Sequence, residues 1–158
     1  MTAFNKDLNP ERLLELSGEV SRIATTLARL SSLSGADPDQ DKPVPDVAVQ
    51  TVRNAIHARR LRERFFDPEF FADPAWDMML DLFEAELSQR RVAISSLCAA
   101  AAVPATTALR WLKALSDQGL FVRRNDPFDG RRVYVELSAD TSIAMRRYFG
   151  ELANLHVA

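Results

Sequence analysis

Between Arg90 and Leu137 the chain reads RRVAISSLCAAAAVPATTALRWLKALSDQGLFVRRNDPFDGRRVYVEL. A short apolar segment leads into a run of small residues, for which Ser95 is the expected helix cap. A turn marked by Pro104 separates this run from a second amphipathic segment that ends at Gly119. Two alternating segments follow, joined by the turn dipeptide Asp129-Gly130. This order predicts a helix, a turn, a second helix and a β-hairpin, which is the winged helix-turn-helix arrangement.

The second helix of this arrangement is predicted to have two distinct faces. Apolar residues at helical spacing should pack on the core, with Leu109 and Trp111 flanking them: Ala108, Leu112 and Leu115. We expect Trp111 to belong to the core rather than to stack on bases. The opposite face carries the residues that we expect to bind DNA: Thr106, Thr107, Arg110 and Lys113. In the major groove, Arg110 can pair with a guanine edge through two hydrogen bonds, and Lys113 can contact phosphate.

The hairpin that follows is predicted to be basic and half-buried. Leu120 and Val122 on the first strand, and alternate residues on the second, should form its buried face: Val133, Val135 and Leu137. We expect Gly130 to adopt a positive φ and Asp129 to orient Arg131 toward the minor groove. The remaining basic residues of the hairpin are also candidate DNA contacts: Arg123, Arg124 and Arg132.

The charge distribution supports a nucleic-acid surface more strongly than the total charge does. The whole chain has a formal net charge of −2, whereas residues 90–132 carry eight basic side chains against three aspartates. That segment is therefore net +5, and the rest of the chain carries −7. A local basic surface on an acidic body can attract phosphate, because screening weakens the distant charges. The alternative is that these arginines form an ordinary solvated face.

The hairpin resembles the wing of the MarR family of bacterial transcription regulators. The similar stretch is GLFVRRNDPFDGRRVYVELS, and the family's Asp-x-Arg motif corresponds to Asp129, Gly130 and Arg131. The resemblance covers residues 75–138 and implies a cytoplasmic homodimer that represses transcription from a near-palindromic operator. It also implies that a small-molecule effector often releases the DNA. This chain has Ala102 where the family's helix-turn-helix usually carries glycine, and only one helix fits after the wing.

Residues 1–33 are predicted to form a long dimerisation helix. Asn9-Pro10 is a strong helix start, because a capping side chain precedes proline at the first helical position. Apolar residues then recur at alternating intervals of three and four: Leu13, Leu16, Val20, Ile23, Leu27 and Leu30. Such a heptad stripe needs a partner, and we expect the same helix of a second subunit. The alternative is packing on the body of the same chain.

Residues 34–46 and 47–72 are expected to connect this helix to the winged domain. The first segment is rich in proline and aspartate and should be flexible. The second begins with a helix, Val47–Phe66, that carries five arginines and is followed by seven acidic residues before Gln89. These opposite charges either neutralise one another or leave a second phosphate-contacting surface. Four aromatic residues are expected in the core, or alternatively around a ligand: Phe65, Phe66, Phe70 and Phe71.

The winged domain is predicted over residues 73–138 and a last helix over 139–158. Asp73 and Pro74 form a cap-and-proline start for its first helix. The predicted buried stripe of that helix is Trp76, Met79, Leu80, Phe83 and Leu87. The last helix should pack through Met145, Tyr148, Phe149, Leu152 and Leu155.

Enzymatic and membrane functions find little support in the sequence. The chain has two histidines, at positions 57 and 156, and no His/Cys cluster with metal-ligand spacing. No glycine-rich phosphate loop is present, so we expect neither catalysis nor a cofactor or metal. We also expect no signal peptide and no membrane span. The single cysteine, Cys98, fits a reducing cytosol and is interpreted as a small hydrophobe rather than an oxidant sensor.

The sequence therefore predicts a mainly α fold with a small β-hairpin, namely a winged helix-turn-helix domain with a long N-terminal dimerisation helix. The expected function is sequence-specific binding of double-stranded DNA by a homodimeric transcription regulator. The alternative is a winged-helix interaction module that joins a larger regulatory complex and has little sequence preference for DNA.

Overall fold

The computed structural model describes residues 18–25 and 42–155. The chain divides into two units, Met1–Pro43 and Val44–Ala158. In the first unit, residues 18–25 are helical, and the side chains of Val20 and Ile23 are 65% and 59% exposed. The other four positions of the predicted heptad stripe lie outside the described residues: Leu13, Leu16, Leu27 and Leu30. The dimerisation helix therefore stays a prediction.

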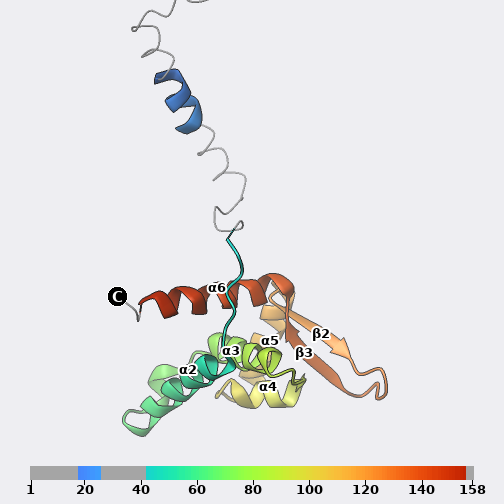
Figure 1. Ribbon diagram of the computed structural model, residues 1–158. Helices are drawn as coiled ribbons and strands as arrows, with labels where there is room; N and C mark the ends of the chain where they lie inside the picture. Colours follow the sequence, from blue (N-terminus) through green and yellow to red (C-terminus); the bar gives the residue numbers. More distant parts are fainter. Residues whose placement is uncertain (1–17, 26–41, 156–158) are drawn as a thin grey trace, which may run out of the picture. The chain divides into compact units, whose positions relative to one another are not determined.

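The second unit consists of helices with a small antiparallel sheet at one side, from which the β2–β3 hairpin projects (Figure 1). Its elements are α2 (Val49–Leu61), the 3-10 turns η1 (Arg62–Arg64) and η2 (Pro68–Phe71), α3 (Pro74–Leu87), β1 (Val92–Ala93), α4 (Ile94–Ala100), α5 (Ala105–Asp117), β2 (Phe121–Asn125), β3 (Val133–Leu137) and α6 (Ala139–Leu155). The strand order is β1-β3-β2, so β1 adds a third strand to the hairpin. This order of helix, turn, helix and hairpin confirms the winged helix fold. None of the described helices combines the length and apolar character that a bilayer crossing requires.

Helix α3 lies at the centre of this unit. Its start is fixed as predicted, because the Asp73 carboxylate accepts a hydrogen bond from the backbone N–H of Trp76 at 3.4 Å and Pro74 is the first helical residue. The helix contacts α2, α4, α5 and β3. Residues on more than one face of α3 are therefore buried, including Met78 and Leu82, which the single predicted stripe omitted.

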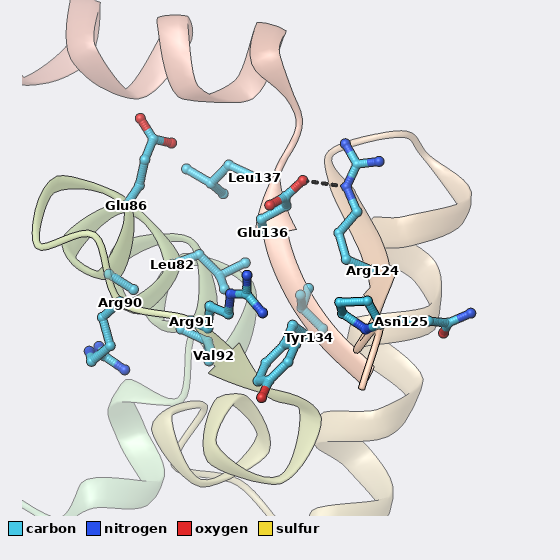
Figure 2. Close-up of a pocket in the computed structure, with 13 residues that line it drawn as sticks. Leu82, Glu86, Arg90, Arg91, Val92, Arg124, Asn125, Tyr134, Glu136 and Leu137 are labelled. Carbon is cyan, nitrogen blue, oxygen red and sulfur yellow. Dashed lines mark hydrogen bonds and ion pairs between the residues drawn. The ribbon is translucent and has the colours of Figure 1, made fainter. Parts of the chain in front are cut away.

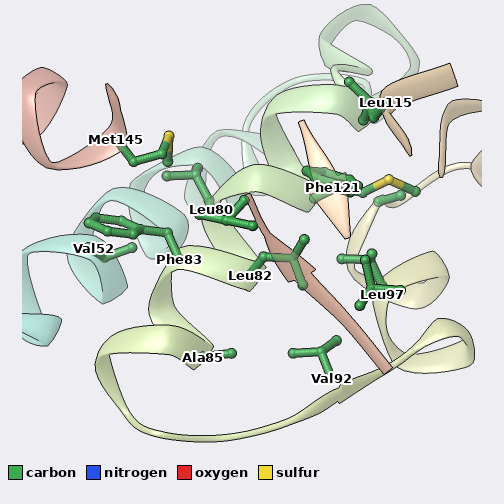
Figure 3. Close-up of a cluster of buried hydrophobic side chains, with 14 of the residues drawn as sticks. Val52, Leu80, Leu82, Phe83, Ala85, Val92, Leu97, Leu115, Phe121 and Met145 are labelled. Atoms are coloured by element: carbon green, nitrogen blue, oxygen red, sulfur yellow. The ribbon is translucent and has the colours of Figure 1, made fainter. Parts of the chain in front are cut away.

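The hydrophobic core gathers side chains from all these elements around α3 (Figure 3). Leu80 and Phe83 of the predicted stripe are fully buried, whereas Trp76, Met79 and Leu87 pack partly buried against the core. The other elements contribute Val52 from α2, Leu97 from α4, Leu115 from α5, Phe121 from β2 and Met145 from α6. One contiguous core thus connects the helix-turn-helix to the hairpin and to both flanking helices.

Helix α6 packs along α3 and is crossed by the segment that enters this unit. The rings of Phe149 and Phe83 stack at 5.6 Å, and the rings of Tyr148 and Trp76 meet edge to face at 5.0 Å. A Cβ atom added at Gly150 would lie 2.7 Å from Cγ of Pro45. The end of the predicted flexible linker is therefore packed at Pro45, while residues 34–41 lie outside the described part. Leu155, predicted to pack, is 76% exposed.

The turn between α4 and α5 contains a residue in a left-handed conformation. Helix α4 begins at Ile94 with Ala93 at its cap, two residues earlier than the predicted Ser95 cap, and α5 begins after Pro104 as predicted. Ala102 has a φ of +53°. This is the position at which the family that the sequence resembles usually carries glycine. A β-carbon disfavours this conformation, so Ala102 holds local backbone strain.

We expect Ala102→Gly to raise the free energy of unfolding by about 0.5–1 kcal/mol. Relief of the left-handed strain exceeds the larger entropy of glycine in the unfolded chain. Urea denaturation of both proteins measures the change. The matched control is Ala114→Gly, which lies exposed in α5 and should lose roughly 1 kcal/mol. A loss of stability for Ala102→Gly similar to that of the control would contradict the strain argument.

Candidate nucleic-acid interface

Helix α5 presents a polar face on the surface. Ala108, Leu112 and Leu115 are buried and hold the helix on the core, as predicted. The predicted contact residues lie on the other side: Thr106, Arg110 and Lys113 are exposed, and Thr107 is half-buried. The Lys113 ammonium group pairs with the Asp117 carboxylate one turn later at 2.5 Å. The helix therefore offers hydroxyl, guanidinium and ammonium groups to a ligand outside the fold.

Two apolar residues of α5 are more exposed than predicted. Trp111 and Leu109 are 41% and 49% exposed, so the prediction that Trp111 belongs to the core is wrong. With 3.6 residues per turn, they lie roughly 70–90° around the helix from the buried line, one on each flank. Trp111, Thr107, Arg110 and Ala114 line a shallow hollow on this surface. The indole ring is therefore part of the exposed surface of α5.

The register of the hairpin decides which wing residues are buried. Phe121 is opposite Leu137 and Arg123 is opposite Val135. Phe121 is 3% exposed, whereas Leu120 and Val122 are only partly buried, so the predicted buried face of the first strand is wrong. Residues directly opposite in an antiparallel pair share one face, which places Phe121 with the buried Val135 and Leu137. On the second strand, the predicted burial of those two residues is confirmed.

The outer face of the wing sheet borders a groove that ends at α3 (Figure 2). The Arg124 Nε donates to the Glu136 Oε1 at 2.7 Å on this face. The Arg91 guanidinium group lies 5.4 Å from the centre of the Tyr134 ring. Glu86 and Arg90 line the other side of the groove. Acidic and basic groups alternate here, unlike the uniformly basic surface that phosphate binding favours.

The connection at the wing tip is a seven-residue loop, residues 126–132, rather than a two-residue turn. Its backbone is closed at both ends, because the N–H of Asp126 donates to Arg132 O at 2.9 Å and the N–H of Arg132 donates to Asp129 O at 2.9 Å. Gly130 does not have the predicted positive φ; of the glycines that the structure describes, Gly119 has it, at +77°. The longer loop turns the chain without a left-handed residue at position 130.

Both aspartates of the loop bind backbone amides. The N–H of Phe128 donates to Asp126 Oδ1 at 2.8 Å, and the Tyr134 hydroxyl donates to Oδ2 at 3.2 Å. The N–H of Arg131 donates to Asp129 Oδ1 at 3.0 Å. Asp129 thus orients the backbone of Arg131, while its Oδ2 atom lies 3.6 Å from Nε of Arg132. The tip loop is fixed by its own carboxylates.

Three of the predicted DNA contacts carry charges that no acidic group balances. Lys113, Arg124 and Arg132 pair with Asp117, Glu136 and Asp129. Arg110, Arg123 and Arg131 are exposed and form no ion pair with any part of the chain that the structure describes. Among the predicted contact residues that the structure describes, these three guanidinium groups, on α5 and on the wing, carry the free positive charges.

The arginines of α2 are in a different situation, because α3 neutralises them. The Nε atom of Arg59 lies 2.7 Å from Asp77 Oδ1, and Nη2 of Arg60 lies 3.3 Å from Asp77 Oδ2. Arg53 and Arg90 both reach Glu84, at 2.8 and 2.9 Å. Of the two interpretations of this charge block, the contacts favour mutual neutralisation. Arg60 also donates to the carbonyl of Ala100 at 2.7 Å, which ties α2 to the end of α4.

Burial and hydrogen bonding shift the pKa values of two carboxyl groups of α3, Asp81 and Glu84, in opposite directions. Burial raises the pKa of Asp81. Burial acts in the same direction on Glu84, but hydrogen bonds from Arg90, Ser88 and Arg53 outweigh it and lower the pKa of that carboxyl. Glu84 is therefore ionised at neutral pH, and this buried carboxylate balances two half-exposed arginines, Arg53 and Arg90.

The aromatic connector before α3 is mostly on the surface. Phe65, Phe66 and Phe70 are 72%, 62% and 79% exposed, so the prediction that they fill the core is wrong. Phe71 is half-buried, with the Arg62 guanidinium group 4.6 Å from its ring centre.

The surroundings of Cys98 disfavour a reactive thiol. Cys98 is half-buried in α4, and burial raises the pKa of its thiol, which disfavours the reactive thiolate. Among residues 18–25 and 42–155, no group of three His, Cys, Asp or Glu side chains could hold a metal ion.

We expect Arg59→Gln to lower the free energy of unfolding by about 2 kcal/mol, since it leaves the Asp77 carboxylate, 6% exposed, with one weaker partner. Thermal or urea denaturation measures the loss. Arg64→Gln, at an exposed position of η1, should change stability by no more than about 0.5 kcal/mol. Equal stability of the two variants would show that α2 is not held by this ion pair.

We expect the wing tip to loosen in acid. The hydrogen bond from the Phe128 amide is the main reason that the pKa of Asp126 lies below its ordinary value. Because the folded pKa is lowered, the ionised carboxylate stabilises the loop at neutral pH, and this contribution is lost as pH falls through the folded pKa. In an NMR titration, the chemical shift of the Phe128 amide proton should change with pH, with a midpoint below the ordinary pKa range of aspartate. Asp126→Asn should abolish this titration; a midpoint above that range would contradict the assignment.

Comparison with known proteins supports the assignment of the domain. Residues 79–140 match the model of a winged helix DNA-binding domain family. No curated protein is similar enough in sequence to be matched. Among solved structures, the transcriptional regulator PA4135 is 22% identical, covering 64% of this chain and 74% of that one, with a TM-score of 0.45. A MepR–DNA complex from S. aureus is 14% identical, covering 68% and 81%, with a TM-score of 0.43.

A mutant of MarR from E. coli is 16% identical, covering 69% of this chain and 78% of that one, with a TM-score of 0.42. These identities and TM-scores are low, so the assignment rests on the matched model and on the strand and helix order. Sequence match and geometry agree that residues 79–140 have a winged helix fold, and the matched model is that of a winged helix DNA-binding domain.

Proposed function

We propose that the protein is a cytoplasmic transcription regulator of the MarR type that binds double-stranded DNA as a homodimer. The observation that carries the proposal is the position of the free positive charges. Arg110 on α5 and Arg123 and Arg131 on the wing are exposed and unbalanced within the described residues of a matched DNA-binding domain. The carboxylates on α3, by contrast, are engaged with arginines of the same fold.

In the proposed complex, α5 enters the major groove. Arg110 binds a guanine edge, and Thr106 and Thr107 contact bases or thymine methyl groups. Lys113 and Arg124 leave their intramolecular carboxylates for phosphates, where they contribute positive charge rather than specificity. Arg131, with its backbone held by Asp129, extends into the adjacent minor groove.

The proposal also includes repression of transcription and pairing of two copies of the chain. The heptad stripe supports pairing with a second copy, and Val20 and Ile23 within it are exposed in the described helix. A twofold dimer places its recognition helices about one duplex turn apart, so we expect an inverted-repeat operator. Selection of bound fragments from random DNA tests this part, because a recovered palindrome reports both symmetry and sequence. A small-molecule effector that releases the operator belongs to the proposal through the family resemblance alone.

We expect Arg110→Ala to weaken binding at a selected site by about 1–3 kcal/mol and to relax the preference at one base pair. Arg131→Ala should weaken binding as well and reduce the salt dependence, by about 0.9 in log–log slope for each lost phosphate contact. Fluorescence anisotropy titrations at several salt concentrations measure both effects.

Arg64→Ala is the matched control, because Arg64 is exposed but lies in η1, outside the matched domain. Its affinity and salt slope should equal those of the unmodified protein. Indifference of binding to both Arg110→Ala and Arg131→Ala would refute the proposed regulator and favour a protein-interaction module. A loss for Arg64→Ala equal to that for Arg131→Ala would instead extend the DNA surface to the α2 region.

A further inference from the structure

An apolar side chain stands at the tip of the basic wing. Phe128 is 97% exposed, the highest exposure among the large hydrophobic residues that the structure describes. It lies in the loop between β2 and β3, which extends beyond the helices of its unit (Figure 1). A phenyl ring in water is unfavourable, and a position this far from the core offers no burial within the unit.

The loop presents this ring on a fixed backbone. The N–H of Phe128 is bound by Asp126 Oδ1 at 2.8 Å, and the same carboxylate accepts from Tyr134 of β3 at 3.2 Å. Further hydrogen bonds close the loop between Asp126 and Arg132. Part of the entropy cost of ordering the tip in a complex is therefore already met in the free protein.

The charges around the ring indicate what kind of surface it meets. The carboxylates of Asp126 and Asp129 turn toward backbone amides of the loop. Arg123 and Arg131, by contrast, are exposed and unpaired within the described part of the chain. An apolar tip between free cations matches a partner with negative charge outside and an apolar interior. Duplex DNA has this organisation, with stacked bases between two phosphate backbones.

We infer that Phe128 is a wedge that inserts from the minor groove between two stacked base pairs, while Arg131 lies in the same groove and Arg123 contacts the flanking backbone. The inference rests on the proposed DNA-binding function and adds a residue to it. Partial unstacking by an apolar side chain kinks DNA toward the major groove. The site should then include a pyrimidine–purine step at the wing, because such steps unstack most easily. Phe128 would thus select sequence without a hydrogen bond to any base.

The test uses the full chain and a short duplex recovered by selection from random DNA, labelled at both ends for energy transfer. The unmodified protein should bend this duplex, and 2-aminopurine placed at the wing step should brighten as it unstacks. Phe128→Ala should bind about tenfold more weakly and leave the duplex straight, because the wedge is lost. Phe128→Met should retain much of the bend, since methionine also serves as a wedge.

Phe70→Ala is the matched control, since Phe70 is 79% exposed but lies in η2, outside the wing. It should bind and bend as the unmodified protein does. Equal bending and affinity for Phe128→Ala and Phe70→Ala would overturn the wedge and leave the regulator proposal intact. Failure of the unmodified protein to bind duplex DNA would overturn both. Phe128-dependent binding to vesicles of anionic phospholipid, without DNA bending, would assign the ring to a membrane surface and overturn the wedge.

Discussion

Burial of α3 is the constraint on which the rest of the structure depends. The helix contacts α2, α4, α5 and β3, and Leu80 and Phe83 lie at the centre of the shared core. The position of α5 follows from this packing, because its buried residues Ala108, Leu112 and Leu115 rest on the same core. The surface that α5 offers to a ligand is therefore set by apolar contacts on its opposite side.

The same helix separates the charges of the domain into two groups. The buried carboxylates of Asp77 and Glu84 on α3 neutralise arginines of α2 and Arg90. On α5 and the wing, Lys113, Arg124 and Arg132 pair with carboxylates of the same elements. Arg110, Arg123 and Arg131 are exposed and have no ion-pair partner among the described residues. A chain that is acidic as a whole can in this way keep a basic face.

The sequence predicted the positions of the helices and strands better than it predicted which of their side chains are exposed. The start of α3 could be predicted because Asp73-Pro74 is a typical helix start. The buried side of α5 could be predicted because Ala108, Leu112 and Leu115 are spaced as on one face of a helix. The exposure of Trp111 was not readable, since periodicity orders residues around a helix without telling how far neighbouring elements cover its flanks. The buried face of β2 depended on its register with β3, a contact between distant residues. The role of the wing tip also escaped the sequence, because Asp129-Gly130 suggested a shorter turn than the loop that carries Phe128.

Pro45 crosses α6 and restricts amino-acid substitution at Gly150, a position where a helix would ordinarily accept other residues. Gly150 stands within α6, where glycine costs roughly 1 kcal/mol relative to alanine. The chain keeps this weak helix former because even a methyl group would collide with the proline ring, 2.7 Å away. Any side chain at that position must displace the incoming segment. Substitutions in α6 are therefore restricted at Gly150, which has no side chain of its own, as well as at the buried Met145 and Phe149.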